Sequence, residues 1–146
     1  MFKDPILQKL YKQYGPHRFE DKNDRLMEGL IEAIINQQLS GKAADTIYKR
    51  FLALFKSNNF PTPEQILKID VEKLRGAGMS YSKANYIKNI AKAFKAGDLE
   101  IKEIQKMKDQ EVIAELTKIK GVGKWTTEMV LIFTLKREDV FSLGDA

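Results

Sequence analysis

The chain has 146 residues, 43% of them hydrophobic, which is enough for one domain with an apolar core. Its 25 Lys and Arg against 20 Asp and Glu give a net charge of +5, which fits an acidic partner such as nucleic acid but does not require one. The lack of cysteine excludes disulfides, thiolate zinc sites and cysteine-ligated iron–sulfur clusters.

Hydrophobic residues recur at helical spacing and nowhere alternate with polar ones over a useful length, so the sequence predicts an all-α fold. Short polar side chains ahead of apolar runs predict N-caps at Ser40, Thr62, Asp70, Ser80 and Asp109. In chain order the expected helices cover residues 4–14, 25–38, 42–55, two short segments after Thr62 and Asp70, 81–96, 99–107, 110–119 and 124–135. The last helix is apolar nearly all round, which predicts a central place in the fold.

The segment 116–130, LTKIKGVGKWTTEMV, is the most informative part of the chain. It is typical of a helix end, a tight turn with Gly121 and Gly123, and a new helix that begins at Lys124 or Trp125. Two glycines two residues apart allow positive φ and a close approach of the backbone to a ligand, and the N-terminus of the next helix suits a phosphate. The lysines that surround the turn are Lys118, Lys120 and Lys124. The alternative is an ordinary helix–turn–helix corner in which glycine ends the first helix.

This segment resembles the hairpin of the HhH-GPD DNA glycosylases of the 3-methyladenine DNA glycosylase II type, in which an apolar residue precedes G-[VI]-G-x-W-T-A. Three more segments resemble motifs of that family and follow the family order along the chain. They are IINQQLS at 34–40, GMSYSKANYI at 78–87 and DVFSLGD at 139–145. Because four motifs in order cover nearly the whole chain, it is identified as a member of this superfamily.

The resemblance implies the HhH-GPD fold, with two helical lobes and a cleft between them. Residues 1–18 would belong to the second lobe, 19–135 to a six-helix-type lobe that contains the hairpin, and 136–146 to a loop with the catalytic aspartate. Relatives continue for several more helices, so the C-terminal part of the second lobe is expected to be missing. We therefore expect the 146-residue chain itself to be inactive, and either self-associated through bared apolar surface or poorly ordered at its ends.

By resemblance the hairpin holds DNA through main-chain N–H groups bonded to a phosphate, which gives position and affinity rather than sequence preference. The residues expected to contact DNA are Gly121, Gly123, Lys120, Lys124 and Thr126 in the hairpin, and Gln38 and Leu39 in a second segment. A glycosylase extrudes its target base, and in the family a residue of this second segment fills the gap in the stack. Gln38 is the expected residue and Leu39 the alternative, unless these side chains are merely solvated at a helix end.

The resemblance makes Asp145 the catalytic carboxylate. Cleavage of the N-glycosidic bond builds positive charge on the sugar, and a carboxylate beside it stabilises that charge and orients or deprotonates the attacking water. Trp125 stands where bifunctional members carry the lysine that attacks the sugar, and an indole cannot form a Schiff base. The resemblance therefore implies a monofunctional enzyme without lyase activity.

An alkylated purine is already cationic, so it leaves without an acid, and electron-rich aromatic side chains favour it over a neutral base. The expected base-pocket residues are Trp125, Tyr81 and Tyr86, for each of which packing in the core is the alternative role. No cofactor is required, but the family implies a monovalent cation, Na⁺ or K⁺, at the hairpin. Its ligands would be the main-chain carbonyls of Thr117, Ile119 and Val122.

The sequence thus predicts a base-excision repair glycosylase that hydrolyses the bond to alkylated purines of the 3-methyladenine type, with double-stranded DNA that contains alkylated bases as its partner. The alternatives are a non-catalytic helix-hairpin-helix module that binds only the DNA backbone, and a helical interaction domain without a nucleic-acid role. No apolar stretch approaches a membrane span and no signal peptide opens the chain, so no membrane association is expected. We expect an intracellular protein, located in the cytoplasm (nucleoid) of a bacterium or in the nucleus of a eukaryote.

Overall fold

The structure is a computed structural model that describes residues 26–37, 39–56, 59–97, 99 and 101–135. Every regular element among these residues is an α-helix, as the sequence predicts. The helices are α2 (Leu26–Asn36), α3 (Gly41–Ala53), α4 (Pro63–Lys68), α5 (Val71–Gly76), α6 (Tyr81–Lys95), α7 (Ile101–Lys106), α8 (Asp109–Leu116) and α9 (Lys124–Phe133). None of them is long and apolar enough to cross a bilayer.

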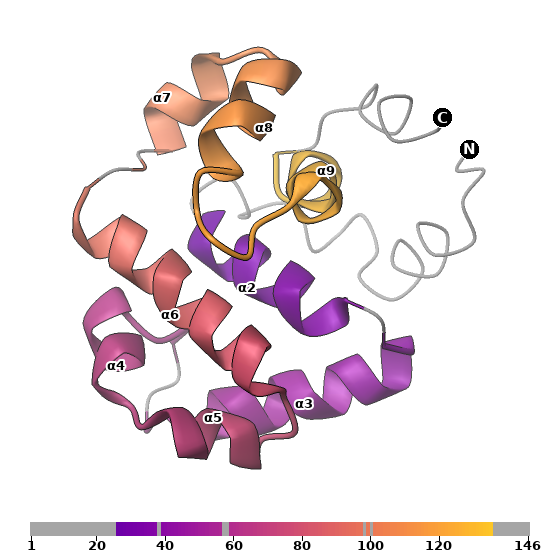
Figure 1. The fold of residues 1–146 in the computed structure, drawn as a ribbon, viewed down its shortest axis with the longest axis vertical. Helices are drawn as coiled ribbons and strands as arrows, with labels where there is room; N and C mark the ends of the chain where they lie inside the picture. Colours follow the sequence, from indigo (N-terminus) through magenta and orange to yellow (C-terminus); the bar gives the residue numbers. More distant parts are fainter. Residues whose placement is uncertain (1–25, 38, 57–58, 98, 100, 136–146) are drawn as a thin grey trace.

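Helices α2 and α9 form the middle of the molecule, with α3, α4 and α5 on one side and α7 and α8 on the other (Figure 1). Nine of the eleven residues of α2 are buried, and α9 is buried over 126–132. The predicted central place of the last helix is therefore confirmed. The expected helix over 4–14 and the segments 1–18 and 136–146 lie outside the described residues.

Helices α2 and α9 touch at both of their ends. At one end Gly29 lies so close to Thr134 that a Cβ on the glycine would come within 2.1 Å of the threonine Oγ1. At the other end the Gln37 Nε2 donates to the Thr126 Oγ1 over 2.5 Å. Because both contacts join the same two helices, the start of α9 is fixed relative to the end of α2.

Helix α6 crosses the molecule beside α2 and α4 (Figure 1). Two of its lysines bond to carbonyls at the carboxyl ends of those helices. The Lys83 Nζ donates to the carbonyls of Ile35 and Gln37, over 3.3 and 2.6 Å. The Lys88 Nζ donates to the carbonyl of Leu67 over 3.2 Å and to that of Ile69. Cations stabilise the carbonyl-rich end of a helix, so each lysine both caps a helix and ties it to α6.

Four of the five predicted N-caps are confirmed. Ser40, Thr62, Asp70 and Ser80 each accept a hydrogen bond from a backbone N–H in the first turn of the following helix. Gly97, at φ +77°, follows the C-cap residue of α6.

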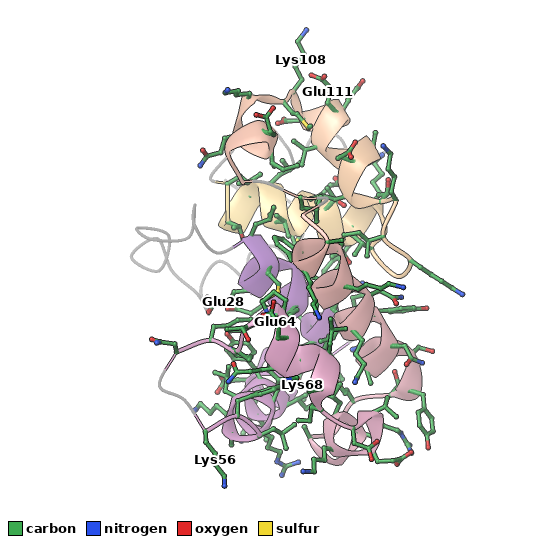
Figure 2. All side chains as sticks on the ribbon, turned by 90° about the vertical axis from the view of Figure 1, so that its left-hand side faces the viewer. Glu28, Lys56, Glu64, Lys68, Lys108 and Glu111 are labelled. Carbon is green, nitrogen blue, oxygen red and sulfur yellow. The ribbon has the colours of Figure 1, made fainter. Side chains whose placement is uncertain are left out.

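The prediction for α8 is wrong by one residue, because the helix begins at Asp109 and its N-cap is Lys108. The reason is that the Lys108 N–H donates to the Glu111 Oε1 over 2.9 Å, at the upper end of the molecule in Figure 2. The Glu111 carboxylate, in the third residue of the helix, thus bonds to the backbone of the N-cap residue, as the glutamate of a capping box does. Helix α8 also ends at Leu116 instead of residue 119, since the chain turns there into the segment described below.

Candidate nucleic-acid interface

The turn between α8 and α9 spans residues 117–123 and is built from short-range hydrogen bonds. The Thr117 N–H and its hydroxyl both donate to the Ile113 carbonyl, over 3.0 and 2.6 Å, which closes α8. The Ile119 N–H bonds to the Leu116 carbonyl, and the Val122 N–H bonds to the Ile119 carbonyl over 3.0 Å. The Val122 side chain is 3% exposed, so the turn is anchored in the core.

Gly121 occupies the turn for two reasons. Its φ is +102°, a backbone conformation that is strained for every residue other than glycine. A Cβ there would also lie 2.1 Å from the Cγ of Tyr86, because the tyrosine ring from α6 sits directly on the glycine. The neighbouring carbonyl of Lys120 accepts a hydrogen bond from the Asn89 Nδ2 over 3.1 Å, so α6 holds the turn at two adjacent points.

The expectation that Gly123 also needs positive φ is wrong. It has φ −94° and ψ −176°, which is extended backbone open to any residue, and no atom of the described residues lies within 4 Å of a Cβ built on it. Gly123 is the N-cap of α9 and supplies no side-chain hydrogen bond to the first turn. The chain itself therefore does not require glycine here, and the missing side chain leaves the space in front of the α9 N-terminus open.

The charges around this open end are mostly positive. Lys118, Lys120 and Lys124 are exposed, and Lys118 forms an ion pair of 3.0 Å with Glu115. Together with the partial positive charge of a helix N-terminus, these ammonium groups favour an anion in front of Gly123.

The two residues that follow Lys124 differ in exposure. Trp125 is half-buried and packs against the core, so part of the indole is accessible. Thr126 is fully buried and its hydroxyl accepts the bond from Gln37, so any contact of Thr126 with DNA is confined to its main chain. The sequence did not reveal this, because the partner of the hydroxyl lies 89 residues away.

Glu128 is a buried acid that the sequence interpretation passed over. It lies one turn after Lys124 and its side chain is almost inaccessible, at 7% exposure. Burial raises the pKa of its carboxyl above the ordinary value, and the positive charge of Lys124 opposes that rise. A lone acid inside the apolar run of α9 was the available signal.

The second expected DNA-contacting segment follows α2. Leu39 is 39% exposed, one of two large hydrophobic side chains exposed in the described part of the chain. It borders a pocket of about 280 Å³ between the end of α2, α3 and the start of α6, with Ile35, Ile47 and Met79 as apolar lining and Lys83 beside them. Burial lowers the pKa of the Lys83 ammonium. Gln38 lies outside the described residues.

The two tyrosines assigned to the base pocket lie in different surroundings. Tyr81 is 49% exposed, its hydroxyl donates to the Glu72 Oε1 over 2.6 Å, and the Arg75 guanidinium carbon lies 3.8 Å from its ring centre. Tyr86 packs on Gly121 at the turn. Each tyrosine thus has a structural contact of its own, and the described contacts do not bring the pair together. Asp145, the expected catalytic residue, lies outside the described residues.

The carbonyls expected to bind a cation belong to Thr117, Ile119 and Val122, within one turn of chain. They are neutral oxygen donors, and of the three the Ile119 carbonyl accepts the Val122 N–H. Within the described residues no group of three or more His, Cys, Asp or Glu forms a site for a divalent metal. Uncharged carbonyl ligands fit a monovalent cation such as Na⁺ or K⁺.

The helical fold and the glycine-bearing turn define a helix-hairpin-helix protein. A family model described as HhH-GPD superfamily base excision DNA repair protein matches residues 31–146. The chain therefore belongs to the HhH-GPD superfamily, and its fold is the fold of that superfamily.

Named relatives point in the same direction. The chain is 42% identical over 140 residues to DNA-3-methyladenine glycosylase 1 of Schizosaccharomyces pombe, which covers 95% of this chain and 61% of that protein. The solved structure of 3-methyladenine DNA glycosylase from the same yeast, in complex with abasic DNA, matches with a TM-score of 0.76 and 38% identity, over 94% of this chain and 68% of the other. That of a DNA-3-methyladenine glycosidase from Bacillus halodurans matches with a TM-score of 0.74 and 31% identity, over 99% and 70%. The chain thus spans about three-fifths of the length of the yeast relative.

Proposed function

We propose that the whole protein is a base-excision repair DNA glycosylase that hydrolyses the N-glycosidic bond of alkylated purines. The observation that carries the proposal is the open N-terminus of α9. Neither the backbone conformation nor the packing of the described residues requires glycine at residue 123. Its lack of a side chain leaves space for a phosphate at the N-terminus of α9, which has lysines around it. The yeast relative whose structure contains abasic DNA supports DNA as the ligand of this surface.

In this proposal the hairpin fixes the DNA and does not read its sequence. Main-chain N–H groups at the start of α9 bond to a phosphate, while Lys120 and Lys124 add attraction that salt screens. The monovalent cation proposed at the carbonyls of Thr117, Ile119 and Val122 would add positive charge on the same side. Few phosphate contacts are involved, so the affinity for undamaged duplex is modest.

The chemistry is assigned to Asp145 and water. The carboxylate stabilises the positive charge that develops on the sugar as the base departs, and it orients or deprotonates the water that adds to the sugar. Alkylation gives the purine its own positive charge, so the base leaves with the bonding electron pair and needs no acid. Trp125, which is half-buried, offers an electron-rich face to such a cationic base.

Release of free base from alkylated DNA tests the proposal. The whole protein is incubated with methylated duplex and the released purines are separated and quantified, with Asp145→Asn as the matched variant. We expect release by the wild type and a fall of at least about a hundredfold in the variant, which keeps the shape of the side chain and loses its charge. Wild-type DNA binding without base release would favour the alternative, a non-catalytic module that binds only the backbone.

A further inference from the structure

The turn that follows α2 is held from two directions by side chains distant in sequence. Lys83, on α6, donates to the Gln37 carbonyl over 2.6 Å and to the Ile35 carbonyl over 3.3 Å. The Gln37 side chain donates to Thr126 on α9 over 2.5 Å. Ile35 near the end of α2 and Gln37 just after it are therefore tied to α6 through their carbonyls, and Gln37 is also tied to the hairpin helix through its side chain.

The Lys83 tether is built at some cost. Its ammonium is partly buried beside the apolar lining of the 280 Å³ pocket, and burial lowers its pKa. Two carbonyls at a helix end offset that burial, because hydrogen bonds from a charged donor are stronger than neutral ones. The arrangement removes freedom from the turn, since a shift of Gln37 would separate the ammonium from its acceptors.

Lys88, also on α6, caps a helix end that presents no exposed apolar side chain, and so serves as a comparison for Lys83. Lys88 donates to the carbonyls of Leu67 and Ile69 at the end of α4, in the same way as Lys83 at the end of α2. The segment after α4 leads directly into Asp70, the N-cap of α5. The segment after α2 instead presents Leu39, whose side chain is 39% exposed. The lysine-to-carbonyl bonds thus support packing of the next helix at the end of α4, and an exposed apolar side chain at the end of α2.

We propose that Lys83 is a positioning residue that holds the turn after α2, and Leu39 with it, at a fixed offset from the hairpin. Duplex DNA held at the start of α9 then meets this turn where the extruded base leaves its gap. Gln37 completes the arrangement because its bond to Thr126 sets the distance between the turn and the hairpin helix. The inference rests on the proposed function and adds to it Lys83 as the residue that fixes the position of the turn.

The test compares Lys83→Met with Lys88→Met, which removes an equivalent helix cap elsewhere on α6. Amide exchange of Leu39 is measured in the free protein. Affinity is measured for a duplex with an abasic-site analogue and for the intact duplex of the same sequence, with 2-aminopurine beside the analogue to report unstacking. We expect Lys83→Met to speed exchange at Leu39 and to weaken binding to the abasic duplex, each by about tenfold, and to reduce the 2-aminopurine signal. Binding to intact duplex should change by less than about twofold, because the hairpin is untouched.

Lys88→Met should lower stability but leave all three DNA readouts unchanged, and Lys83→Arg should restore most of the preference for the abasic duplex. Equal losses in both methionine variants, or a preference that Lys83→Met retains, would overturn the inference. If Lys83→Met does not fold, Gln37→Leu replaces it, since this change removes only the bond to Thr126 and the same losses are expected. A wild type that releases bases but shows no preference for the abasic duplex would overturn the link between the turn and the gap, whereas a wild type that releases no base would refute the proposed function. In both cases the Leu39 exchange rate decides whether Lys83 holds the turn.

Discussion

Gly121 and Gly123 lie two residues apart in the same turn, but different constraints act on them. The backbone at Gly121 has positive φ and the ring of Tyr86 covers it, so folding requires glycine there. The backbone at Gly123 is extended and faces open space, so folding does not. A side chain at either position should therefore produce a different kind of defect.

We predict that Gly123→Ser folds at least as stably as the wild type and binds DNA about tenfold more weakly. Serine is a favourable N-cap, but its hydroxyl bonds to the first N–H groups of α9 and occupies the place of a phosphate. Gly121→Ala should lose about 1–3 kcal/mol of unfolding free energy. Urea unfolding and fluorescence anisotropy with labelled duplex measure the two effects. Unchanged DNA affinity in Gly123→Ser would argue against a phosphate at the end of α9.

We predict that Glu128 gives the stability of the protein a pH dependence. Its pKa is raised in the folded state, so its contribution is fully present below the unfolded value of 4.5 and is lost as pH rises through the folded pKa. Glu128→Gln carries no charge at any of these pH values, so it should be more stable than the wild type at neutral pH. Thermal unfolding across this range measures the difference, and parallel curves for the two proteins would contradict the assignment.

Helices α2 and α9 approach closely at Gly29, where the Thr134 hydroxyl occupies the space that a side chain at residue 29 would need. We predict that Gly29→Ala loses about 1–3 kcal/mol, because the new methyl group overlaps the Thr134 Oγ1. Adding Thr134→Ala should recover about 1 kcal/mol or more, since the two changes relieve one another. Chemical denaturation of the single and double variants gives this coupling energy. Additive losses would show that the strain lies elsewhere.

The ends of the helices show where local chemistry is sufficient. Ser40, Thr62, Asp70 and Ser80 cap helices through hydrogen bonds to residues two or three positions ahead, and such short-range partners are visible in the sequence. The early end of α8 was not predicted, because the turn after it depends on α6. Tyr86 covers Gly121 and Asn89 bonds to the Lys120 carbonyl, and no local pattern contains either contact.

On the scale of the whole molecule, the sequence predicted a hairpin between two helices correctly, but it gave α8 the wrong ends and gave the wrong reasons for some residues. Gly123 was assigned a conformational role that only Gly121 has. The buried hydroxyl of Thr126 and the caps supplied by Lys83 and Lys88 depend on pairs of helices that only the fold brings together. A motif gives the order of residues along the chain, and the direction of each side chain depends on neighbours at long sequence separation.

For the whole protein acting on DNA, we predict base release without strand cleavage. Trp125 occupies the position at which bifunctional members of the superfamily carry the Schiff-base lysine. Abasic sites should therefore remain intact until alkali is added. Treatment with borohydride during the reaction should trap no covalent adduct, as judged by a gel-shifted labelled strand. An adduct in the wild type that disappears in Lys124→Ala would show that the neighbouring lysine forms the Schiff base and that the enzyme is bifunctional.

The contacts of α6 with the turn between α8 and α9 also affect the thermodynamics of DNA binding by that turn. Tyr86 and Asn89 fix Gly121 and the Lys120 carbonyl, so the turn has its shape before any ligand arrives. A surface that is already ordered loses little conformational entropy when it captures a phosphate, and more of the interaction energy remains as affinity. It also opens only when α6 moves away, so the protection of its amides should follow unfolding of the whole molecule and not local fraying.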